Sequence, residues 1–315
     1  MKSKKVKKLL RNNNTILVIV LIGICLALSV CTEYFATPRN VTAILQQMST
    51  NGILATGMTL CIITAGINLS VGSVLSFCGI VLALCLRAGM PPAAAILIAV
   101  LAGTACGTIN GGLVTVFKIP PFIATLGMQS VAAGVALMLT DGRPISGVSN
   151  GIVVLGSGKL GIIPVSFLIM LGCFIAAHIL MNYMRIGRYF YTIGGNEEAA
   201  RLSGVNIYIY KALPFVISGI FSALAAVVVT GRLNSAEPVA GSGMELDAIA
   251  ASVIGGTSMS GGEGKIIGTF LGVVIMSVIR NGMIQLNVGT YPQQVVIGVI
   301  IIVVVLIDMM NRKKN

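Results

Sequence analysis

No charged side chain occurs in residues 40–86, which read NVTAILQQMSTNGILATGMTLCIITAGINLSVGSVLSFCGIVLALCL. A helix that crosses the hydrocarbon core of a bilayer needs about 20 predominantly apolar residues, so this stretch is long enough for two such helices. Residues 66–72, GINLSVG, contain the glycines, Asn68 and Ser70 that are typical of a turn between them. The stretch therefore predicts a pair of membrane-spanning helices.

The composition indicates that most of the chain lies in a membrane. Hydrophobic residues make up 56% of the 315 residues and charged residues only 10%, whereas soluble domains carry about 25% charged residues. Apolar stretches follow one another with little polar sequence between them, so two soluble domains are not expected from the length. We therefore interpret residues 15–310 as one transmembrane domain of the all-α class.

Further apolar stretches extend this interpretation to the rest of the chain. They are residues 15–32, 93–117, 122–140, 162–183, 212–230, 244–260, 266–283 and 292–307. With the pair in residues 40–86 they predict a polytopic protein of about ten transmembrane helices. The stretch at 244–260 is the least regular, because Glu245 and Asp247 shorten it and glycines surround it. A broken or re-entrant helix there, and a smaller total, stays open.

The basic residues gather in three places, although the net charge of +12 could also suggest nucleic acid. Six lie in residues 1–14, three in residues 311–315, and four flank the polar segment 185–211. Cytoplasmic loops of membrane proteins carry an excess of Lys and Arg. We therefore expect the N-terminus, the C-terminal tail and segment 185–211 in the cytoplasm, and no nucleic-acid partner.

Groups that could perform catalysis or bind a metal form no recognisable pattern. The sequence contains no G-x-x-x-x-G-K-[ST] phosphate loop and no H-E-x-x-H zinc motif. Four acidic residues of the C-terminal half are not spaced as a pair on one helix face: Glu237, Glu245, Asp247 and Glu263. We predict that the chain is not an enzyme and has no metal and no cofactor of its own.

The predicted spans between residues 15 and 140 contain no acidic or basic residue, and the four acids above fall in predicted loops or helix ends. A bundle without buried charge is therefore expected. Charges inside a membrane are costly and are usually retained for ion or proton coupling. Their absence argues against a carrier driven by an ion gradient.

The polar segment GGNEEAARLSGV, residues 194–205, predicts a short, well-capped helix. Asn196 suits the N-cap, Glu197 and Glu198 place negative charge in the first turn, and Gly204 suits a left-handed C-terminal stop. A rigid helix among basic residues on the cytoplasmic side could dock a soluble partner. A capped loop without such a role is the alternative.

This segment, together with RLNSAEPVAGSGMELDAIAASVIGGTSMSGGEGKIIGT (232–269) and AGINLSVGSV (65–74), resembles the signature stretches of sugar-importing ABC permeases. The resemblance covers nearly the whole chain and implies a non-catalytic subunit. It also implies three protein partners: an ATP-binding cassette subunit that binds ATP and Mg²⁺, an extracellular or periplasmic sugar-binding protein, and a second copy of this chain. The residues implied to couple the permease to the ATPase are Asn196, Glu197, Glu198, Ala199, Ala200, Arg201, Leu202, Ser203 and Gly204.

Neutral polar and small residues within the predicted spans and in the turn at 66–72 are candidates for the translocation path. They are Asn68, Ser70, Gly72, Ser73, Asn110, Gln129 and Asn281. Hydrogen bonding between helices is the alternative role for each. The resembling family commonly carries Asp at the position of Asn68, which puts any role for charge there in doubt.

The resemblance implies import of ribose or a similar small sugar through the plasma membrane of a bacterium. Xylose, galactose, autoinducer-2 or a nucleoside are alternative cargoes, and an ion-coupled carrier is the alternative of another class. The chain has no Trp and few aromatic residues, although aromatic faces are common in sugar pockets. We therefore expect the external binding protein to select the sugar.

Overall fold

The computed structural model describes residues 13–312, which contain thirteen helices and four two-residue strands. The expected cytoplasmic ends, residues 1–14 and 311–315, fall almost entirely outside the described residues. The long helices are α2 (Asn13–Cys31), α3 (Pro38–Ile63), α4 (Val71–Arg87), α5 (Pro92–Thr115), α6 (Pro121–Met138), α8 (Val165–Tyr183), α11 (Ile207–Leu233), α13 (Ile266–Gln285) and α14 (Thr290–Arg312).

Shorter elements connect them. The helices are α7 (Asn150–Ser157), α9 (Arg185–Gly195), α10 (Glu197–Leu202) and α12 (Met244–Ile254), and the strands are β1 (Ile145–Ser146), β2 (Lys159–Leu160), β3 (Ile163–Pro164) and β4 (Ser235–Ala236). Strand β1 pairs with β4, and β2 pairs with β3, both antiparallel. The prediction of an all-α protein is therefore confirmed apart from these two short pairs.

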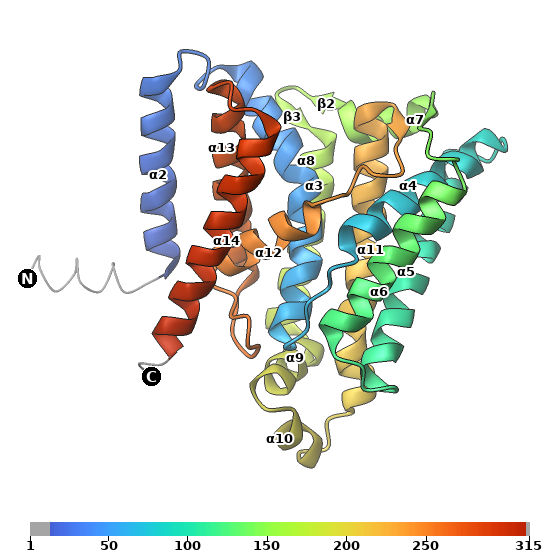
Figure 1. Cartoon of the computed structure of the whole chain (residues 1–315), viewed down its shortest axis with the longest axis vertical. Coiled ribbons are helices and arrows are strands. Elements are labelled where there is room, and N and C mark those ends of the chain that lie inside the picture. Colours follow the sequence, from blue (N-terminus) through green and yellow to red (C-terminus); the bar gives the residue numbers. More distant parts are fainter. Residues whose placement is uncertain (1–12, 313–315) are drawn as a thin grey trace, which may run out of the picture.

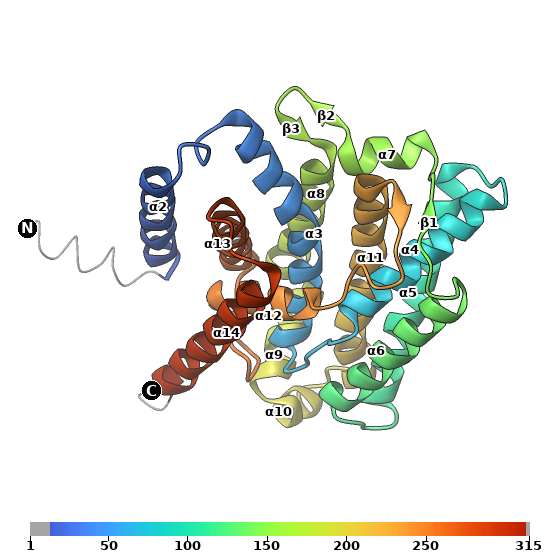
Figure 2. The ribbon, with the colours of Figure 1, turned by 45° about the horizontal axis from the view of Figure 1, so that its top comes forward.

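Helix α3 forms the centre of the bundle (Figure 2). Every residue from Met48 to Ile63 is buried, although many of these residues are polar. Most of their hydroxyls are satisfied within the protein: Thr56 donates to the carbonyl of Gly52, and Thr59 lies 2.7 Å from the hydroxyl of Thr269. The Thr50 hydroxyl is the exception, with no partner among residues 13–312. A helix that packs against other helices on all sides can carry polar groups where its own backbone or a neighbouring helix provides hydrogen-bond partners.

Small residues bring α5 and α11 together. Gly103, Gly107 and Gly111 recur every fourth residue of α5, on one face of the helix. A Cβ at Gly103 would overlap the carbonyl oxygen of Gly219, and one at Gly107 would overlap that of Phe215. Lipid provides no hydrophobic force between helices, so this close backbone approach supplies the packing that holds the pair.

The molecule has two differently built ends (Figure 1). Helices α9 and α10 lie below the long helices in this view, whereas α7 and the β2–β3 pair lie at the opposite end. The first turn of α2 and the last turn of α14 both point toward the α10 end. We refer to these as the α10 end and the β2–β3 end.

The predicted spans can be compared directly with the helices. Each apolar stretch contains a helix, and residues 40–86 contain α3 and α4, separated at residues 64–70 as expected. Among the described residues, six helices are long and apolar enough to cross a membrane: α2, α5, α6, α8, α11 and α13. A multi-pass membrane protein is therefore supported.

The stretch at 244–260 is indeed broken. Helix α12 ends at Ile254 after 11 residues, and at 1.5 Å per residue this covers about 16 Å of a hydrocarbon core roughly 30 Å thick. Non-helical chain precedes it at residues 237–243 and follows it at residues 255–265. The helix therefore begins within the bundle instead of at its edge.

Candidate functional site

The capped segment at the α10 end folds as the sequence predicts. The Asn196 side chain accepts a hydrogen bond from the backbone N–H of Ala199 at 3.0 Å. At the other terminus Gly204 has φ +81°, and the N–H groups of Gly204 and Val205 donate to the carbonyls of Arg201 and Ala200. This reciprocal pair is the Schellman arrangement, which fixes where the helix stops.

Two ion pairs stiffen this helix. Arg201 donates in bidentate fashion to Glu198 three residues earlier, and Lys211 Nζ lies 2.6 Å from Glu197 Oε2. The first pair lies within α10, whereas the second ties α10 to the first turns of α11. Hydrogen bonding and the positive charge of Arg201 lower the pKa of Glu198 below its ordinary value, so this carboxylate is ionised near neutral pH.

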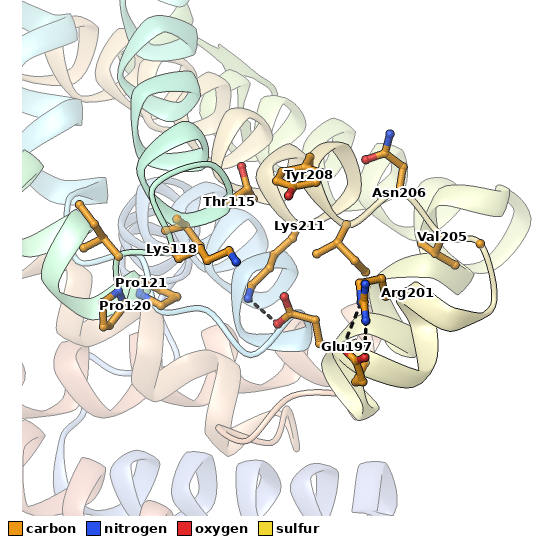
Figure 3. A pocket seen from close by; sticks show the side chains of 15 residues that line it. Thr115, Lys118, Pro120, Pro121, Glu197, Arg201, Val205, Asn206, Tyr208 and Lys211 are labelled. Carbon is orange, nitrogen blue, oxygen red and sulfur yellow. Dashed lines mark hydrogen bonds and ion pairs between the residues drawn. The ribbon is translucent and has the colours of Figure 1, made fainter.

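A crevice of about 1020 Å³ lies between α10, the start of α11 and the loop that joins α5 to α6. Figure 3 shows Lys118, Glu197 and Lys211 meeting in it from these different elements. Lys118 makes no ion pair with any residue between 13 and 312. The crevice is therefore a charged surface recess beside the predicted coupling helix.

Apolar side chains are also exposed beside this crevice. Leu202 at the end of α10 is 77% exposed, and Tyr208 and Ile209 at the start of α11 are 59% and 57% exposed. They lie next to charged residues at the α10 end, unlike the apolar side chains that cover the long helices. Such a mixture of charged and apolar side chains is typical of a surface that binds another protein.

Segment 185–211 is joined to the bundle mainly through backbone contacts. The N–H of Gly262, in the loop after α12, donates to the carbonyl of Ile63 at the end of α3 at 2.9 Å. Gly194 of α9 fits directly against both groups, because a Cβ there would overlap them. The Tyr191 hydroxyl donates to the carbonyl of Gly264 at 2.8 Å. We call this contact of α9, α3 and the 255–265 loop the glycine junction.

Three of the path candidates bond to one another. Asn68 Oδ1 accepts a hydrogen bond from the Ser70 hydroxyl at 2.7 Å, and Asn110 Nδ2 donates to the same hydroxyl at 2.9 Å. Asn68 Nδ2 donates to Ser218 of α11 at 3.0 Å. All of these side chains are buried. This arrangement favours the alternative role, hydrogen bonding between helices.

Asn281 lies in a separate amide cluster. Its side chain exchanges two hydrogen bonds with Asn40, at 2.8 and 3.0 Å, and Gln285 adds a third to Asn40 Oδ1. These groups join α13 to the first turn of α3. The structure therefore does not bring Asn281 together with the other path candidates.

Ser73 and Gln129 do come together, at a cavity of about 370 Å³ between α4, α6 and residues 237–243. Gly72 lies just behind this wall, against the carbonyl of Gly241 and the carboxylate of Glu245. Gln129 Nε2 donates to Glu245 Oε1 at 3.4 Å. The sequence analysis did not predict that Glu245 contacts Gln129, although the position of Glu245 in the irregular stretch at 244–260 was a signal.

The prediction of a bundle without buried charge is wrong. Asp247 is 2% exposed and Glu245 8% exposed, and Arg280 of α13 pairs with Asp247 at 2.9 Å. The prediction treated the two acids as residues of a helix end outside the bundle. Because α12 starts within the bundle, the two acids in its first turn are buried. Arg280 could have been found, because it is the one charge in the otherwise apolar stretch at 266–283.

These features define a polytopic membrane protein with a capped helix at one end and a polar cavity between α4, α6 and residues 237–243, as expected of a membrane permease. Residues 40–305 match the family described as "Branched-chain amino acid transport system / permease component". The chain therefore belongs to this family of ABC-transporter permeases, which confirms the resemblance.

Individual relatives agree with this assignment. The chain is 41% identical over 289 residues to the ribose import permease of Bacillus subtilis (strain 168), covering 91% of this chain and 89% of that one. It is 40% identical to the D-allose permease of Escherichia coli (strain K12), covering 90% and 88%. It is 33% identical to the autoinducer 2 permease of Photorhabdus laumondii, covering 96% and 91%. No solved structure matches the chain.

Proposed function

We propose that this chain is the permease subunit of an ABC importer that carries ribose or a similar small sugar across the bacterial plasma membrane. The observation that carries the proposal is the sequence identity of 40–41% to ribose import permeases over at least 90% of the chain. The exposed, capped helix at one end of a membrane bundle supports it, because this is where a separate motor can bind.

Ten membrane crossings agree best with the fold. Helices α2, α3, α4, α5, α6, α8, α11, α13 and α14 give nine, and residues 234–254, which include the broken helix α12, give the tenth. An even number returns both termini to the side of α10, as their directions in Figure 1 suggest. With the α10 end cytoplasmic, both termini and segment 185–211 lie in the cytoplasm.

The energy for transport comes from a partner in this proposal. An ATPase subunit binds ATP and Mg²⁺, and its conformational change acts on residues 196–204. The exposed Leu202 and Tyr208 and the charged crevice beside them give that subunit a mixed surface to bind. The glycine junction then carries the movement of α9 to α3 and to the loop that follows α12.

The proposed importer contains two further components. A second copy of this chain completes the pathway, and an external binding protein delivers the sugar at the β2–β3 end. The chain itself contributes no cofactor and no catalytic group.

An ion-coupled carrier requires reconsideration because the bundle does contain charge. Asp247 and Arg280 form an ion pair at 2.9 Å, and such a pair can have a structural role without taking part in ion transport. Membership of the ABC permease family favours the ATP-driven mechanism. Two relatives are named as permeases for D-allose and autoinducer 2, so these two solutes are the alternative cargoes to test.

Uptake by a reconstituted complex tests the function. The permease is co-purified with its ATPase, placed in proteoliposomes with the loaded binding protein, and supplied with labelled ribose, D-allose or autoinducer 2. We expect ribose accumulation that requires ATP and persists when sodium and proton gradients are dissipated. Accumulation by the permease alone under an ion gradient would refute the proposal.

Cross-linking tests the docking surface separately. Leu202→Cys is placed in the assembled complex, with Ile162→Cys, an exposed apolar position in the β2–β3 loop, as the matched control. We expect the first variant to cross-link to the ATPase and the second to remain free. Equal cross-linking of both positions to the ATPase would contradict the proposal that α10 docks this subunit.

A further inference from the structure

The cavity of about 370 Å³ between α4, α6 and residues 237–243 is a candidate for the place where the cargo is held. Its volume falls within the range of about 300–1,000 Å³ that small-molecule sites occupy. It is separate from the crevice beside α10, with which it shares no lining residue.

The polar side chains of this cavity are neutral. They come from three elements: Ser73, Ser76, Gln129, Ser130 and Ser242. No charged side chain is among its lining residues in the described chain, and the rest of the wall is apolar. A site of this kind suits a neutral solute with several hydroxyl groups and does not suit an ion or an amino acid, whose charges would be unpaired there.

Two of these hydroxyls have hydrogen-bonding capacity to spare. The hydroxyls of Ser73 and Ser242 form no hydrogen bond to any residue in the range 13–312, although the Ser242 backbone N–H donates to the Val239 carbonyl. The Ser76 hydroxyl accepts a hydrogen bond from the N–H of Gly241 at 2.9 Å. Ser76 thus fixes the 237–243 segment against α4. Ser73 and Ser242 remain able to donate to, or accept from, a solute in the cavity.

Gln129 is oriented by Glu245. A carboxylate can only accept hydrogen bonds, so the amide nitrogen of Gln129 must face Glu245 Oε1, from which it lies 3.4 Å away. Glu245 is 8% exposed and does not line the cavity itself. The contact leaves the amide oxygen of Gln129 available to accept a hydrogen bond from a hydroxyl group.

We infer that this cavity is a sugar-binding subsite of the translocation path, in which Gln129 binds a sugar hydroxyl and Glu245 is the positioning residue behind it. The inference rests on the proposed function and adds to it the place and the chemistry of cargo binding. Its wall has no aromatic ring, so the sugar is held by few contacts and is released easily, as a passage requires.

Transport measured per ATP tests Gln129. The complete complex with its binding protein is reconstituted, and labelled ribose is the probe. We expect Gln129→Ala to lower ribose uptake per ATP hydrolysed about tenfold, the effect of losing one good hydrogen bond. The matched control Gln47→Ala removes the same amide from α3, outside this cavity, and should leave the ratio unchanged.

Protection from labelling tests the site without measuring transport. Ser242→Cys is labelled with a membrane-impermeant thiol reagent in the complete complex, and the peptide containing residue 242 is followed by mass spectrometry. We expect millimolar ribose to slow labelling at least threefold, while labelling of the native, exposed Cys31 does not change. Adding Glu245→Gln should remove the protection and leave the rate without ribose unaltered.

The outcomes separate the two proposals. If the unmodified complex takes up no sugar, the proposed function fails. If it takes up ribose while Gln129→Ala behaves like Gln47→Ala and ribose does not protect residue 242, the subsite inference is overturned. If Gln129→Ala fails to assemble, the inference is tested by the Ser242→Cys variant with Gln129 intact: protection by ribose supports the subsite, and no protection overturns it.

Discussion

Two short helices of this molecule start with a pair of acidic residues, but the pairs lie in different surroundings. Helix α10 carries Glu197 and Glu198 in its first turn, and both are exposed or half-exposed at the α10 end. Helix α12 also carries its two acids, Glu245 and Asp247, in the first turn, and both are buried in the bundle. The helix dipole favours negative charge at both starts, so local sequence rules cannot tell them apart.

The difference lies in how each start is completed. In α10 the Asn196 side chain caps the helix and water reaches the carboxylates. In α12 the N-cap is Gly243, which has φ +82° and no side chain, and the carboxylates depend on Gln129, Asn51 and Arg280. An exposed acidic helix start is therefore a local feature, whereas a buried one depends on partners from other helices.

Breaking the buried ion pair gives the largest expected effect. Arg280→Gln leaves Asp247 buried without its counter-charge, which costs about 3–5 kcal/mol in comparable pairs. We expect poor accumulation in the membrane and a much lower unfolding temperature in detergent.

The double variant Asp247→Asn with Arg280→Gln is the control for that prediction. It removes both charges and should recover most of the lost stability, because no unpaired charge remains. If the single and double variants are equally unstable, charge pairing is not what holds α12 to α13.

A second variant tests the backbone at the start of α12. Gly243→Ala forces a side chain into a left-handed conformation at roughly 1–2 kcal/mol. We expect a smaller fall in unfolding temperature than for Arg280→Gln. Gly243→Asn is the matched control, since Asn tolerates this conformation better, and it should lie between Ala and the unmodified chain.

Removing the cap of α10 has an effect that stays local. Asn196→Ala loses the hydrogen bond to the Ala199 N–H and about 1 kcal/mol of helix stability. Hydrogen exchange of the α10 amides should accelerate about fivefold, whereas the unfolding temperature of the bundle stays constant. Asn196→Asp keeps a side-chain acceptor and should exchange like the unmodified chain; faster exchange in both would show that the cap is not responsible.

The smallest effect concerns pH. Arg201 lowers the pKa of Glu198, so the stabilisation from this pair is present above the ordinary pKa of a glutamate and is lost as pH falls through the lowered pKa. A carbon-detected NMR titration should place the Glu198 midpoint below that of a free glutamate. Arg201→Gln should raise it toward the ordinary value, and an unchanged midpoint would mean that the ion pair does not form in solution.

The sequence predicts most of what depends on local rules. Apolar stretches located the long helices, and the capping residues Asn196 and Gly204 located α10 to within two residues of each end. A broken helix at 244–260 was one of two possibilities that the sequence left open, because acids and glycines interrupt this stretch.

What depends on distant partners could not be predicted in the same way. Asp247 and Arg280 are 33 residues apart, and nothing near either residue indicates that they meet. Asn68 and Asn110 were considered for the path, but their amides hold helices together through Ser70 and Ser218. Only Ser73 and Gln129 of those candidates share a cavity.

The direct contact of Gly194 with the backbone carbonyl of Ile63 and the backbone N–H of Gly262 has a mechanical consequence. Side chains between two elements can change rotamer and absorb a shift, but backbones in direct contact have no such slack. A displacement of α9 therefore shifts the end of α3 and the 255–265 loop directly. Deformation is expected instead in the non-helical connections outside this junction.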